Sequence, residues 1–565
     1  MKSIVGLLAV VASCLFPVGD AVVLTASEAP TVTIDSGAVV GVATSPAGAS
    51  ATVNKYLGIP FGASPVRFAP AVRPTPWKKP FQATKYGPAC VQQFNYPEAS
   101  RNASIAWFDT PPPPAGESED CLNVNVYVPG LPGKNKTVMA WIYGGSLRIG
   151  ANSLPDYDGS YFAANQDVII VTLNYRTNVF GFPNTAEIPF TERNLGFLDQ
   201  RFALDWVQRN IVAFGGDSKK VTIFGESAGA GSVDVLVTSF AKNPPFRAAI
   251  MESGQATSYV NTTNAPTAWL ALAAALNCTT THPDSNLTCI RNQSASTLKN
   301  IIEHQALIFR PVTDNLTVLR YPENARLNRS TANVPIMVGT NANEATLFVV
   351  GQTNASAYLS ALLPYQPAIN SAILASYPGS SDDQVPEIVT DFTFQCPVGI
   401  LTNDSQKAGL PTWRYFYNAS FPNINLTGLP DAGVFHSSEI KLVYGTYSRV
   451  GATEEEKALS HYIQTAWANF AKHPQVGPGW AQVPALAELG SNGMLKTMTT
   501  AAELDSRCGF YLDAYKAAGI APTTKSRSRC CAGELSESHF DRSQICKVIS
   551  IPTYGRVNHE VCTGV

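Results

Sequence analysis

The stretch Val221-Thr222-Ile223-Phe224-Gly225-Glu226-Ser227-Ala228-Gly229 decides how the rest of the chain is interpreted. β-Branched and aromatic residues run into a Gly-x-Ser-x-Gly motif, and small residues follow as far as Ser232. This pattern is typical of a strand that turns sharply into a helix around one strained serine, because glycines on either side avoid clashes at the turn. Ser227 would project from the turn above the positive end of the helix. As a nucleophile it would also need a base, an acid and an oxyanion hole.

The composition is that of a folded protein with a large core. The 565 residues are 45% hydrophobic and only 15% charged, which argues against disorder. The formal net charge of −2 argues against a nucleic-acid partner, which would call for a clustered basic surface. The length admits several domains or one large α/β unit with insertions, and we interpret residues 22–520 as a single catalytic domain.

The N-terminus has the pattern of a secretory signal peptide. Lys2 precedes an apolar run from Ile4 to Val18, and Gly19-Asp20-Ala21 supplies small residues for cleavage. The run is short for a membrane span, and no later segment reaches spanning length without polar interruption. We therefore expect a signal peptide over residues 1–21, a secreted protein and no transmembrane anchor.

Sequons and cysteines agree with export. Of the eleven cysteines, Cys14 lies in the signal peptide, which leaves ten, an even number that suits disulfides in an oxidising compartment. Their spacing lacks the paired Cys-x-x-Cys sets of a zinc site. Twelve Asn-x-Ser/Thr sequons predict a glycoprotein. Their asparagines are Asn102, Asn135, Asn261, Asn277, Asn286, Asn292, Asn315, Asn328, Asn354, Asn403, Asn418 and Asn425.

Strand-like and helix-like segments alternate through the centre of the chain. Alternation of this kind indicates a mostly parallel sheet, with the active site at the carboxyl ends of its strands. The strand-like runs are 124–128, 138–143, 168–173, 221–224, 248–252, 334–339 and 413–417. Helical patterns cover 195–214, which Gly215-Gly216 should end, and 454–472, which Pro474 should end.

Five other segments are less regular. Residues 31–42 and 55–61 are expected to be edge strands of an opening sheet. The segment between Cys90 and Cys121 contains four consecutive prolines, so we expect a stapled surface loop without a helix. Residues 261–329 are polar and helix-leaning, as in an insertion. The tail, 521–565, holds four cysteines and has no functional interpretation.

A serine nucleophile needs a histidine base downstream. His436 lies in a loop-like stretch after a predicted strand and is the candidate, although a surface-loop histidine is the alternative. His461 and His473 belong to the helical pattern at 454–472, where a structural role is expected. The remaining downstream histidines, His539 and His559, lie in the tail.

The acid and the oxyanion hole have candidates beside predicted strands. Glu344 follows the strand-like run at 334–339, which places a carboxylate where it can support a histidine. The run at 138–143 leads into a Gly-Gly-Ser loop, so the amides of Gly145 and Ser146, with that of Ala228, could hold an oxyanion. Solvated turns are the alternative at both places.

These motifs carry a family resemblance over residues 30–515. The chain resembles the type-B carboxylesterase/lipase family, which includes fungal lipases and cholinesterases, in several specific motifs. These are Gly-Glu-Ser-Ala-Gly at 225–229, Asn-Leu-Gly-Phe-Leu-Asp-Gln-Arg at 194–201, Gly-Gly-Asp at 215–217, Ser-Glu-Asp-Cys-Leu-Asn at 118–123, Tyr-Leu-Gly-Ile-Pro-Phe at 56–61 and Asn-Tyr-Arg at 174–176.

The resemblance implies an α/β-hydrolase fold, with a large, mostly parallel central sheet and helical insertions. It implies Ser227 as nucleophile, Glu344 as acid and His436 as base. It also implies disulfides, which pair Cys90 with Cys121, Cys278 with Cys289, and Cys396 with Cys508. The cysteines of the tail, Cys530, Cys531, Cys546 and Cys562, have no counterpart in it.

The oxyanion loop departs from the family pattern. Ser146 and Leu147 stand where the family usually has a third glycine and an aromatic residue. A serine still has an amide, but it adds strain of about 1 kcal/mol or more if the position needs positive φ. The sequence therefore predicts an active enzyme that is slower than one with glycine at this position.

The expected function is a secreted serine hydrolase that cleaves carboxylic esters through an acyl-enzyme, with no metal or cofactor. Its substrate would be a small-molecule or lipid ester, and triacylglycerol lipase, cholinesterase-like esterase and non-catalytic adhesion protein are the alternatives. Trp107 and Phe108 are interpreted as surface-loop aromatics, with a choline-binding tryptophan or a lipid-facing lid as alternatives. The sequence does not indicate the oligomeric state.

Overall fold

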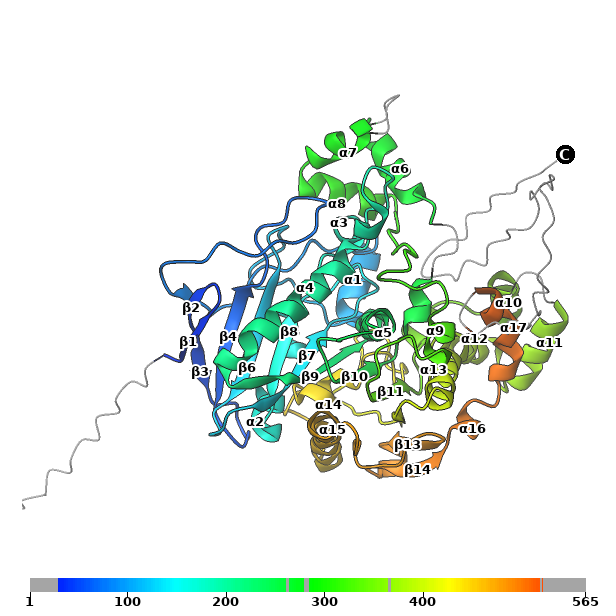
Figure 1. Ribbon diagram of the computed structural model, residues 1–565. Coiled ribbons are helices and arrows are strands. Elements are labelled where there is room, and N and C mark those ends of the chain that lie inside the picture. Colours follow the sequence, from blue (N-terminus) through cyan, green and yellow to red (C-terminus); the bar gives the residue numbers. More distant parts are fainter. Residues whose placement is uncertain (1–28, 261–263, 279–283, 364–366, 519–520, 522–565) are drawn as a thin grey trace, which may run out of the picture.

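A large twisted sheet forms the centre of the molecule (Figure 1). The computed structural model describes residues 29–260, 264–278, 284–363, 367–518 and 521. The sheet has eleven strands. In spatial order they are β14 (Thr497–Thr500), β13 (Ala485–Leu489), β12 (Thr412–Tyr417), β11 (Ile336–Asn341), β10 (Ala248–Glu252), β9 (Gly216–Glu226), β7 (Lys136–Ile142), β8 (Ile169–Leu173), β6 (Asn123–Pro129), β4 (Val53–Pro60) and β3 (Val42–Thr44).

The centre of the sheet is parallel, as the alternating pattern predicted. Every pairing from β8 across to β13 is parallel, and the pairings outside that range are antiparallel. β10 has the predicted bounds, whereas β9 begins earlier than predicted, at Gly216. Its first residues, including Lys219 and Lys220, are polar and only partly buried, so they do not show the apolar run by which a buried strand is detected.

Helices cover both faces of the parallel region. α4 (Leu195–Asn210) and α5 (Ala228–Ser239) lie on one face, while α2 (Ser160–Gln166), α14 (Ile440–Tyr444) and α15 (Glu454–Lys472) lie together on the other (Figure 1). The residues of β7, β8 and β10 are buried along their whole length for this reason. Gly215 ends the α4 segment with φ 85°, in the left-handed conformation expected of a glycine stop.

The first strands only partly match the prediction. Residues 31–42 were expected to form an edge strand, but β1 (Thr31–Ile34) and β2 (Gly37–Val40) form a hairpin in a separate three-stranded sheet with β5 (Phe81–Gln82). Gly37, with φ 132°, stands at the turn between them. The segment 55–61 does belong to the main sheet, as β4.

The segment between Cys90 and Cys121 contains a helix, so the prediction of a loop without one was wrong. α1 spans Glu98–Trp107, and its residues include no proline. Pro97 precedes the helix and the four consecutive prolines follow it, so they bound it instead of breaking it. Glu98 lies in the first turn, where a negative charge stabilises the helix dipole.

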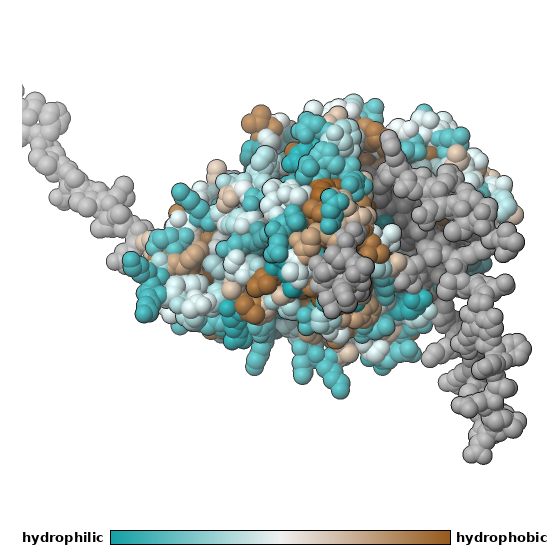
Figure 2. Space-filling model, turned by 90° about the horizontal axis from the view of Figure 1, so that it is seen from above, coloured by the Kyte–Doolittle hydropathy of each residue, from teal (hydrophilic) through white to brown (hydrophobic). Residues whose placement is uncertain are grey.

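The described part of the insertion at 261–329 contains four helices, in agreement with its helix-leaning sequence. It contains α6 (Thr267–Ala275), α7 (Asp284–Arg291), α8 (Ala295–His304) and α9 (Pro322–Leu327), and α6 to α8 lie at the top of Figure 1. Figure 2 shows this end from above, where hydrophilic residues surround small, separate groups of hydrophobic ones.

A second cluster of buried residues lies beside the main core. It is built from the segment that follows Glu344 and from the residues near the end of the described chain, including Phe392, Tyr511 and Tyr515. The helices of this region are α10 (Ala355–Leu362), α11 (Pro367–Ser376), α12 (Ser381–Thr390), α13 (Cys396–Lys407), α16 (Ala501–Leu504) and α17 (Leu512–Ala518).

The three disulfides implied by the family resemblance are present. They join Cys90 to Cys121, Cys278 to Cys289, and Cys396 to Cys508. The four cysteines of the tail, the predicted signal peptide and the sequon at Asn261 lie outside the described residues. Within the described part of the chain, no helix is both long enough and apolar enough to span a bilayer.

Candidate active site

The carboxyl ends of the parallel strands meet at one edge of the sheet. Ile142 of β7 is opposite Gly225 of β9, Glu226 is opposite Glu252 of β10, and Glu252 is opposite Gly339 of β11. The loops that follow these strands therefore lie next to one another. Ser227, the Gly-Gly-Ser loop and Glu344 are all carried by them.

Ser227 occupies the strained turn that the motif predicted. Its φ is 55° and its ψ −122°, between the end of β9 and the start of α5. A Cβ atom at Gly225 would lie 2.4 Å from the carbonyl oxygen of Ile142, and one at Gly229 would lie 1.9 Å from it. The two glycines of the motif are therefore required by the close approach of β7.

Backbone hydrogen bonds hold the strained serine. Its amide donates to the carbonyl of Glu252 at 2.7 Å, and its carbonyl accepts from the amide of Gly231 at 2.9 Å. A Cβ atom at Gly254 would come within 2.1 Å of the same carbonyl oxygen. The turn is thus fixed by its neighbours on β10 and α5, which is what keeps a strained conformation populated.

Glu344 and His436 form a buried pair. His436 Nδ1 lies 2.6 Å from Glu344 Oε2, and the backbone amide of Asn341 donates to Glu344 Oε1 at 2.7 Å. Both side chains are almost inaccessible to solvent. The structure therefore joins the predicted acid to the predicted base, although 92 residues separate them in the chain. His461 and His473, on and after α15, are exposed.

Glu226, inside the serine motif, is a site residue that sequence reasoning missed. Its Oε1 lies 3.0 Å from His436 Nε2 and accepts a hydrogen bond from Ser437 Oγ at 2.6 Å. The contact between Glu226 and His436 is an ion pair, since His436 Nε2 makes no hydrogen bond with any described residue. The signal available was an acidic residue close behind the mostly apolar run at 221–224.

The carboxylates around His436 set its protonation. Burial alone would lower the pKa of His436, but Glu226 and Glu344 more than offset burial and raise this pKa to about 9. Burial raises the pKa of Glu226 to about 7, against the opposing effects of His436 and Ser437. Burial also raises the pKa of Glu439 to about 8. The neighbouring carboxylates therefore stabilise the imidazolium that forms when His436 takes up a proton.

Substitution of Glu226 by glutamine is expected to move the acid limb of the pH profile to lower pH. A neutral imidazole is the form that accepts a proton, and the charge of Glu226 helps to hold the pKa of His436 up. Removal of that charge lowers this pKa, so His436 is neutral at lower pH. The measurement is kcat/KM for a p-nitrophenyl ester against pH. The control is Glu454→Gln, whose side chain is 90% exposed. An acid limb that stays in place or moves to higher pH would contradict this assignment.

The oxyanion loop lies directly against the serine turn. A Cβ atom at Gly144 would lie 3.0 Å from Ser227 Cβ. The backbone amides of Gly145, Ser146 and Ala228 donate no hydrogen bond to any described residue. Gly145 and Ser146 line the same pocket as Ser227. Three backbone amides without a hydrogen-bond partner among the described residues therefore lie in or next to the serine turn and its loop.

Ser146 does have positive φ, the condition under which the sequence predicted strain. Its φ is 58°, and that of the following Leu147 is 57°. Glycine adopts such angles at no steric cost, so Ser146→Gly removes about 1 kcal/mol of strain or more. We expect kcat on a short-chain ester to rise by up to about fivefold, because the loop then holds its amides in place without opposing torsion. Asn243→Gly, at an exposed residue with φ 49°, is the control. An unchanged kcat in Ser146→Gly would refute the strain argument.

One pocket contains the serine and the histidine and is aromatic on one side. Phe108 stacks on Phe348 with ring centroids 6.0 Å apart. The rings of Phe348 and Phe394 lie 5.0 Å and 4.9 Å from the ring of His436. Trp107 is half-buried and is not among the residues that line the pocket. The pocket is lined by Gln93, Asn95, Ser104, Phe108, Gly145, Ser146, Arg148, Ile149, Glu226, Ser227, Phe348, His436 and Ser437.

Comparison with known proteins places this geometry in a family. The sequence profile of the carboxylesterase family matches residues 28–488. The chain belongs to the carboxylesterase family. The para-nitrobenzyl esterase of Bacillus subtilis (strain 168) is 36% identical over 453 residues, which are 74% of this chain and 86% of that esterase. The cholinesterase of Mus musculus is 32% identical over 460 residues, which are 75% of each protein.

Solved structures agree with the family assignment. A structure of PNB esterase superposes with a TM-score of 0.70 at 32% identity, covering 85% of this chain and 99% of that esterase. This carboxylesterase therefore has the α/β-hydrolase fold, and it is a carboxylic ester hydrolase. The resemblance inferred from the motifs and the predicted fold class are both confirmed.

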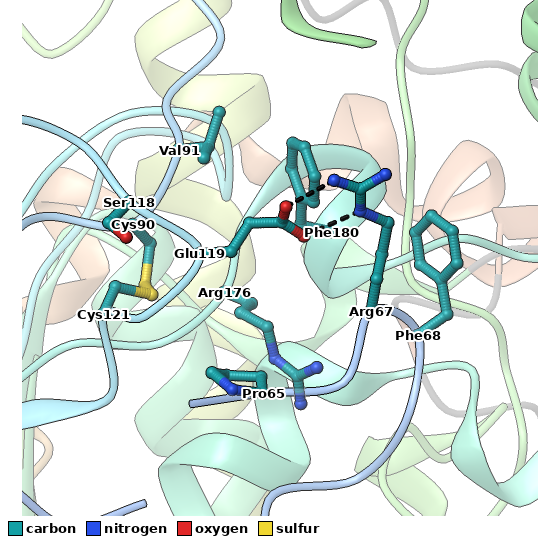
Figure 3. A pocket seen from close by; sticks show the side chains of 10 residues that line it. All are labelled: Pro65, Arg67, Phe68, Cys90, Val91, Ser118, Glu119, Cys121, Arg176 and Phe180. Atoms are coloured by element: carbon teal, nitrogen blue, oxygen red, sulfur yellow. Dashed lines mark hydrogen bonds and ion pairs between the residues drawn. A yellow bond between two sulfur atoms is a disulfide. The ribbon is translucent and has the colours of Figure 1, made fainter. Parts of the chain in front are cut away.

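A second hollow in this carboxylesterase is structural (Figure 3). It lies beside the Cys90–Cys121 disulfide, where Arg67 pairs with Glu119 through two nitrogens. The same guanidinium donates to the carbonyls of Ile290, Arg291 and Gln293 at the end of α7. Arg67 thus ties the disulfide loop to the helical insertion, and none of the predicted catalytic residues lines this hollow.

Proposed function

We propose that this carboxylesterase hydrolyses its substrates through an acyl-enzyme formed on Ser227. The observation that supports the proposal most strongly is the buried Glu344–His436 hydrogen bond of 2.6 Å, because its histidine lines the same pocket as the strained serine. A nucleophile, an acid and a base in this chain order match the arrangement of an α/β-hydrolase triad.

In the first half of the reaction, His436 Nε2 removes the proton from Ser227 Oγ as this oxygen attacks the ester carbonyl. Glu344 holds Nδ1 protonated, so that Nε2 is the basic nitrogen, and it stabilises the imidazolium that forms. The amides of Gly145, Ser146 and Ala228 donate to the carbonyl oxygen as it becomes negative. His436 then passes the proton to the departing alcohol.

In the second half, water takes the place of the alcohol. His436 removes a proton from the water, which attacks the acyl carbonyl, and the same three amides hold the second oxyanion. The proton returns to Ser227 Oγ and the carboxylic acid leaves. The proposed cycle uses only side chains, amides and water, so we propose no role for a metal or cofactor.

We propose soluble carboxylic esters as the substrates, in preference to emulsified triacylglycerols. The side chains next to His436 are aromatic. Other lining residues are polar, and such side chains do not favour the binding of a long alkyl chain; they are Gln93, Asn95, Ser104 and Arg148. The choline-site alternative finds no support at Trp107, which does not line the pocket. Rates on tributyrin and triolein, below and above their solubility limits, test this proposal. Hydrolysis of dissolved tributyrin with no jump in rate at the limit is expected, and activity confined to emulsions would favour a lipase instead.

We also propose that the protein is secreted and glycosylated. Apart from Asn286, which is half-buried, every sequon asparagine in the described part of the chain is exposed. Three disulfides suit an oxidising compartment. Expression in a eukaryotic host should yield protein in the medium whose mass falls after treatment with a peptide N-glycosidase. Retention in the cell with no change in mass would overturn this proposal.

A further inference from the structure

The active-site pocket is small in this structure. Its volume is about 50 Å³, which is room for only a few water molecules. The serine turn and the Glu344–His436 pair are fixed by buried hydrogen bonds, so the catalytic side of the pocket cannot yield to a larger ligand. Admission of a longer ester therefore requires movement of another part of the wall, and Phe108, which is half-buried, belongs to that part.

Phe108 is the last ring of an aromatic wall. Phe394 is buried and stacks on Phe348 with ring centroids 5.7 Å apart, and Phe348 stacks on Phe108 at 6.0 Å. Phe348 and Phe394 also contact the ring of His436. The wall thus runs from the buried histidine to Phe108, which lines the pocket together with the serine. The position of Phe108 therefore sets how far the pocket extends on this side.

The backbone hydrogen bonds around Phe108 are local. The amides of Phe108 and Thr110 donate to carbonyls of α1 at 3.1 and 3.0 Å, so both bonds stay within the segment. Asp109 has φ 41°, in the left-handed region, which costs a residue other than glycine some strain. The four prolines at 111–114 follow, and a proline has no amide hydrogen to donate. Side-chain contacts are therefore needed to fix this segment against the rest of the pocket.

An ion pair supplies such a contact. Lys441 Nζ donates to Asp109 Oδ2 at 2.6 Å, although the two residues are 332 positions apart in the chain. Lys441 belongs to α14 and follows Ser437, which lines the pocket, by about one helical turn. The ion pair therefore joins the segment that carries Phe108 to the segment that carries His436 and Ser437.

A second carboxylate fixes the position of Lys441. Asp156 Oδ1 lies 3.6 Å from the same nitrogen, and the side chains of Lys441 and Asp156 are 28% and 19% exposed. Burial alone would lower the pKa of Lys441, but Asp156 and Asp109 more than offset burial and raise this pKa above its usual value. An isolated exposed ion pair contributes little, whereas a partly buried network of charges holds its geometry better. Asp109 is thus attached to a charge that is itself anchored.

We propose that the ion pair between Asp109 and Lys441 determines substrate size, by selecting short-chain esters over medium-chain esters. While the pair is formed, Phe108 stays against Phe348 and the pocket keeps its small volume. A longer chain must displace Phe108 and so break the ion pair, whereas a short chain need not. The free energy of breaking the pair therefore opposes only the longer ester. The inference rests on the proposed hydrolysis at Ser227, and it adds the size class of the preferred substrate.

The test compares p-nitrophenyl octanoate with p-nitrophenyl acetate, both below their solubility limits. For Asp109→Asn, we expect the ratio of kcat/KM for the octanoate to kcat/KM for the acetate to rise about fivefold, the upper range for one exposed ion pair. The value of kcat/KM for the acetate should stay within about twofold of the wild type. Lys441→Met should raise the ratio similarly, and Lys441→Arg, which keeps the charge, should leave it near the wild-type value.

A double-mutant cycle separates one shared ion pair from two independent residues. The variant with both Asp109→Asn and Lys441→Met should show no higher ratio than the larger of the single variants, because each change breaks the same pair. Asp513→Asn is the matched control, since Asp513 pairs with Lys516 at 3.3 Å and lies outside the pocket. Its ratio should equal that of the wild type.

A rise of less than about twofold in Asp109→Asn would overturn the proposal, and so would single effects that multiply in the double variant. If Lys441→Met does not fold, Asp109→Asn decides alone, because the side chain of Asp109 is 54% exposed and Lys441 keeps Asp156 as a partner. Failure of the wild type to hydrolyse p-nitrophenyl acetate would instead count against the proposed function itself.

Discussion

Ser227→Ala is expected to lower kcat for p-nitrophenyl butyrate by about 100,000-fold or more. Alanine retains the fold of the turn but has no Oγ to attack the carbonyl, so no acyl-enzyme forms. The residual rate would come from the oxyanion amides and the pocket acting on water. Burst-phase and steady-state kinetics with purified protein measure the loss, and Ser258→Ala, at an exposed serine outside the pocket, is the matched control.

Retention of even a tenth of the wild-type turnover in Ser227→Ala would rule out this serine as the nucleophile. Circular dichroism and the thermal midpoint of the variant must match those of the wild type for the comparison to hold. Since Ser227 has φ 55°, alanine carries a similar backbone strain, and we expect no large change in stability.

Glu344→Gln is expected to lower kcat by about 10,000-fold. The carboxylate accepts the proton of His436 Nδ1 at 2.6 Å, which leaves Nε2 basic. A glutamine amide can donate to Nδ1 and so favours the opposite tautomer, whose Nε2 carries a proton and cannot act as a base. The variant should also lose the carboxylate that stabilises the imidazolium.

Glu439→Gln separates this orienting role from the general effect of buried charge. Glu439 is buried near His436 and accepts from Asn341, but it makes no hydrogen bond to the histidine. We expect its loss of kcat to stay below about tenfold. The double variant Ser227→Ala with Glu344→Gln should be no slower than Ser227→Ala alone, because the two residues act as a unit. Equal losses in Glu344→Gln and Glu439→Gln would contradict the assigned role of Glu344.

Much of the fold could be predicted because its parallel strands are buried on both faces. Such strands appear as short, continuous apolar runs, which is why β10 was found with the bounds that the structure has. The bounds of α15 were predicted from its helical periodicity and from Pro474, which follows it. α1 was missed because the proline run that follows it dominated the interpretation of the loop. The hairpin of β1 and β2 was missed because residues 31–42 were interpreted as one strand, although Asp35-Ser36-Gly37 is a turn signal.

The predicted site residues share a different kind of signal. Each of the three predicted catalytic residues follows a strand and lies in a motif or at a position that the chemistry requires; they are Ser227, Glu344 and His436. The structure brings Glu344 to His436 and places His436 in one pocket with Ser227. Glu226 carried no such signal, because its importance depends on the group that faces it in three dimensions, namely His436.

The most direct measurement is mass-spectrometric mapping of a fluorophosphonate adduct on the intact protein. The probe reacts with a serine that has an activated hydroxyl group and an oxyanion hole, and it forms a stable phosphonyl-enzyme. We predict a single adduct on Ser227, formed in proportion to the loss of ester hydrolysis and absent from Ser227→Ala. An adduct on another residue, or full loss of hydrolysis without modification of Ser227, would contradict a mechanism centred on this serine.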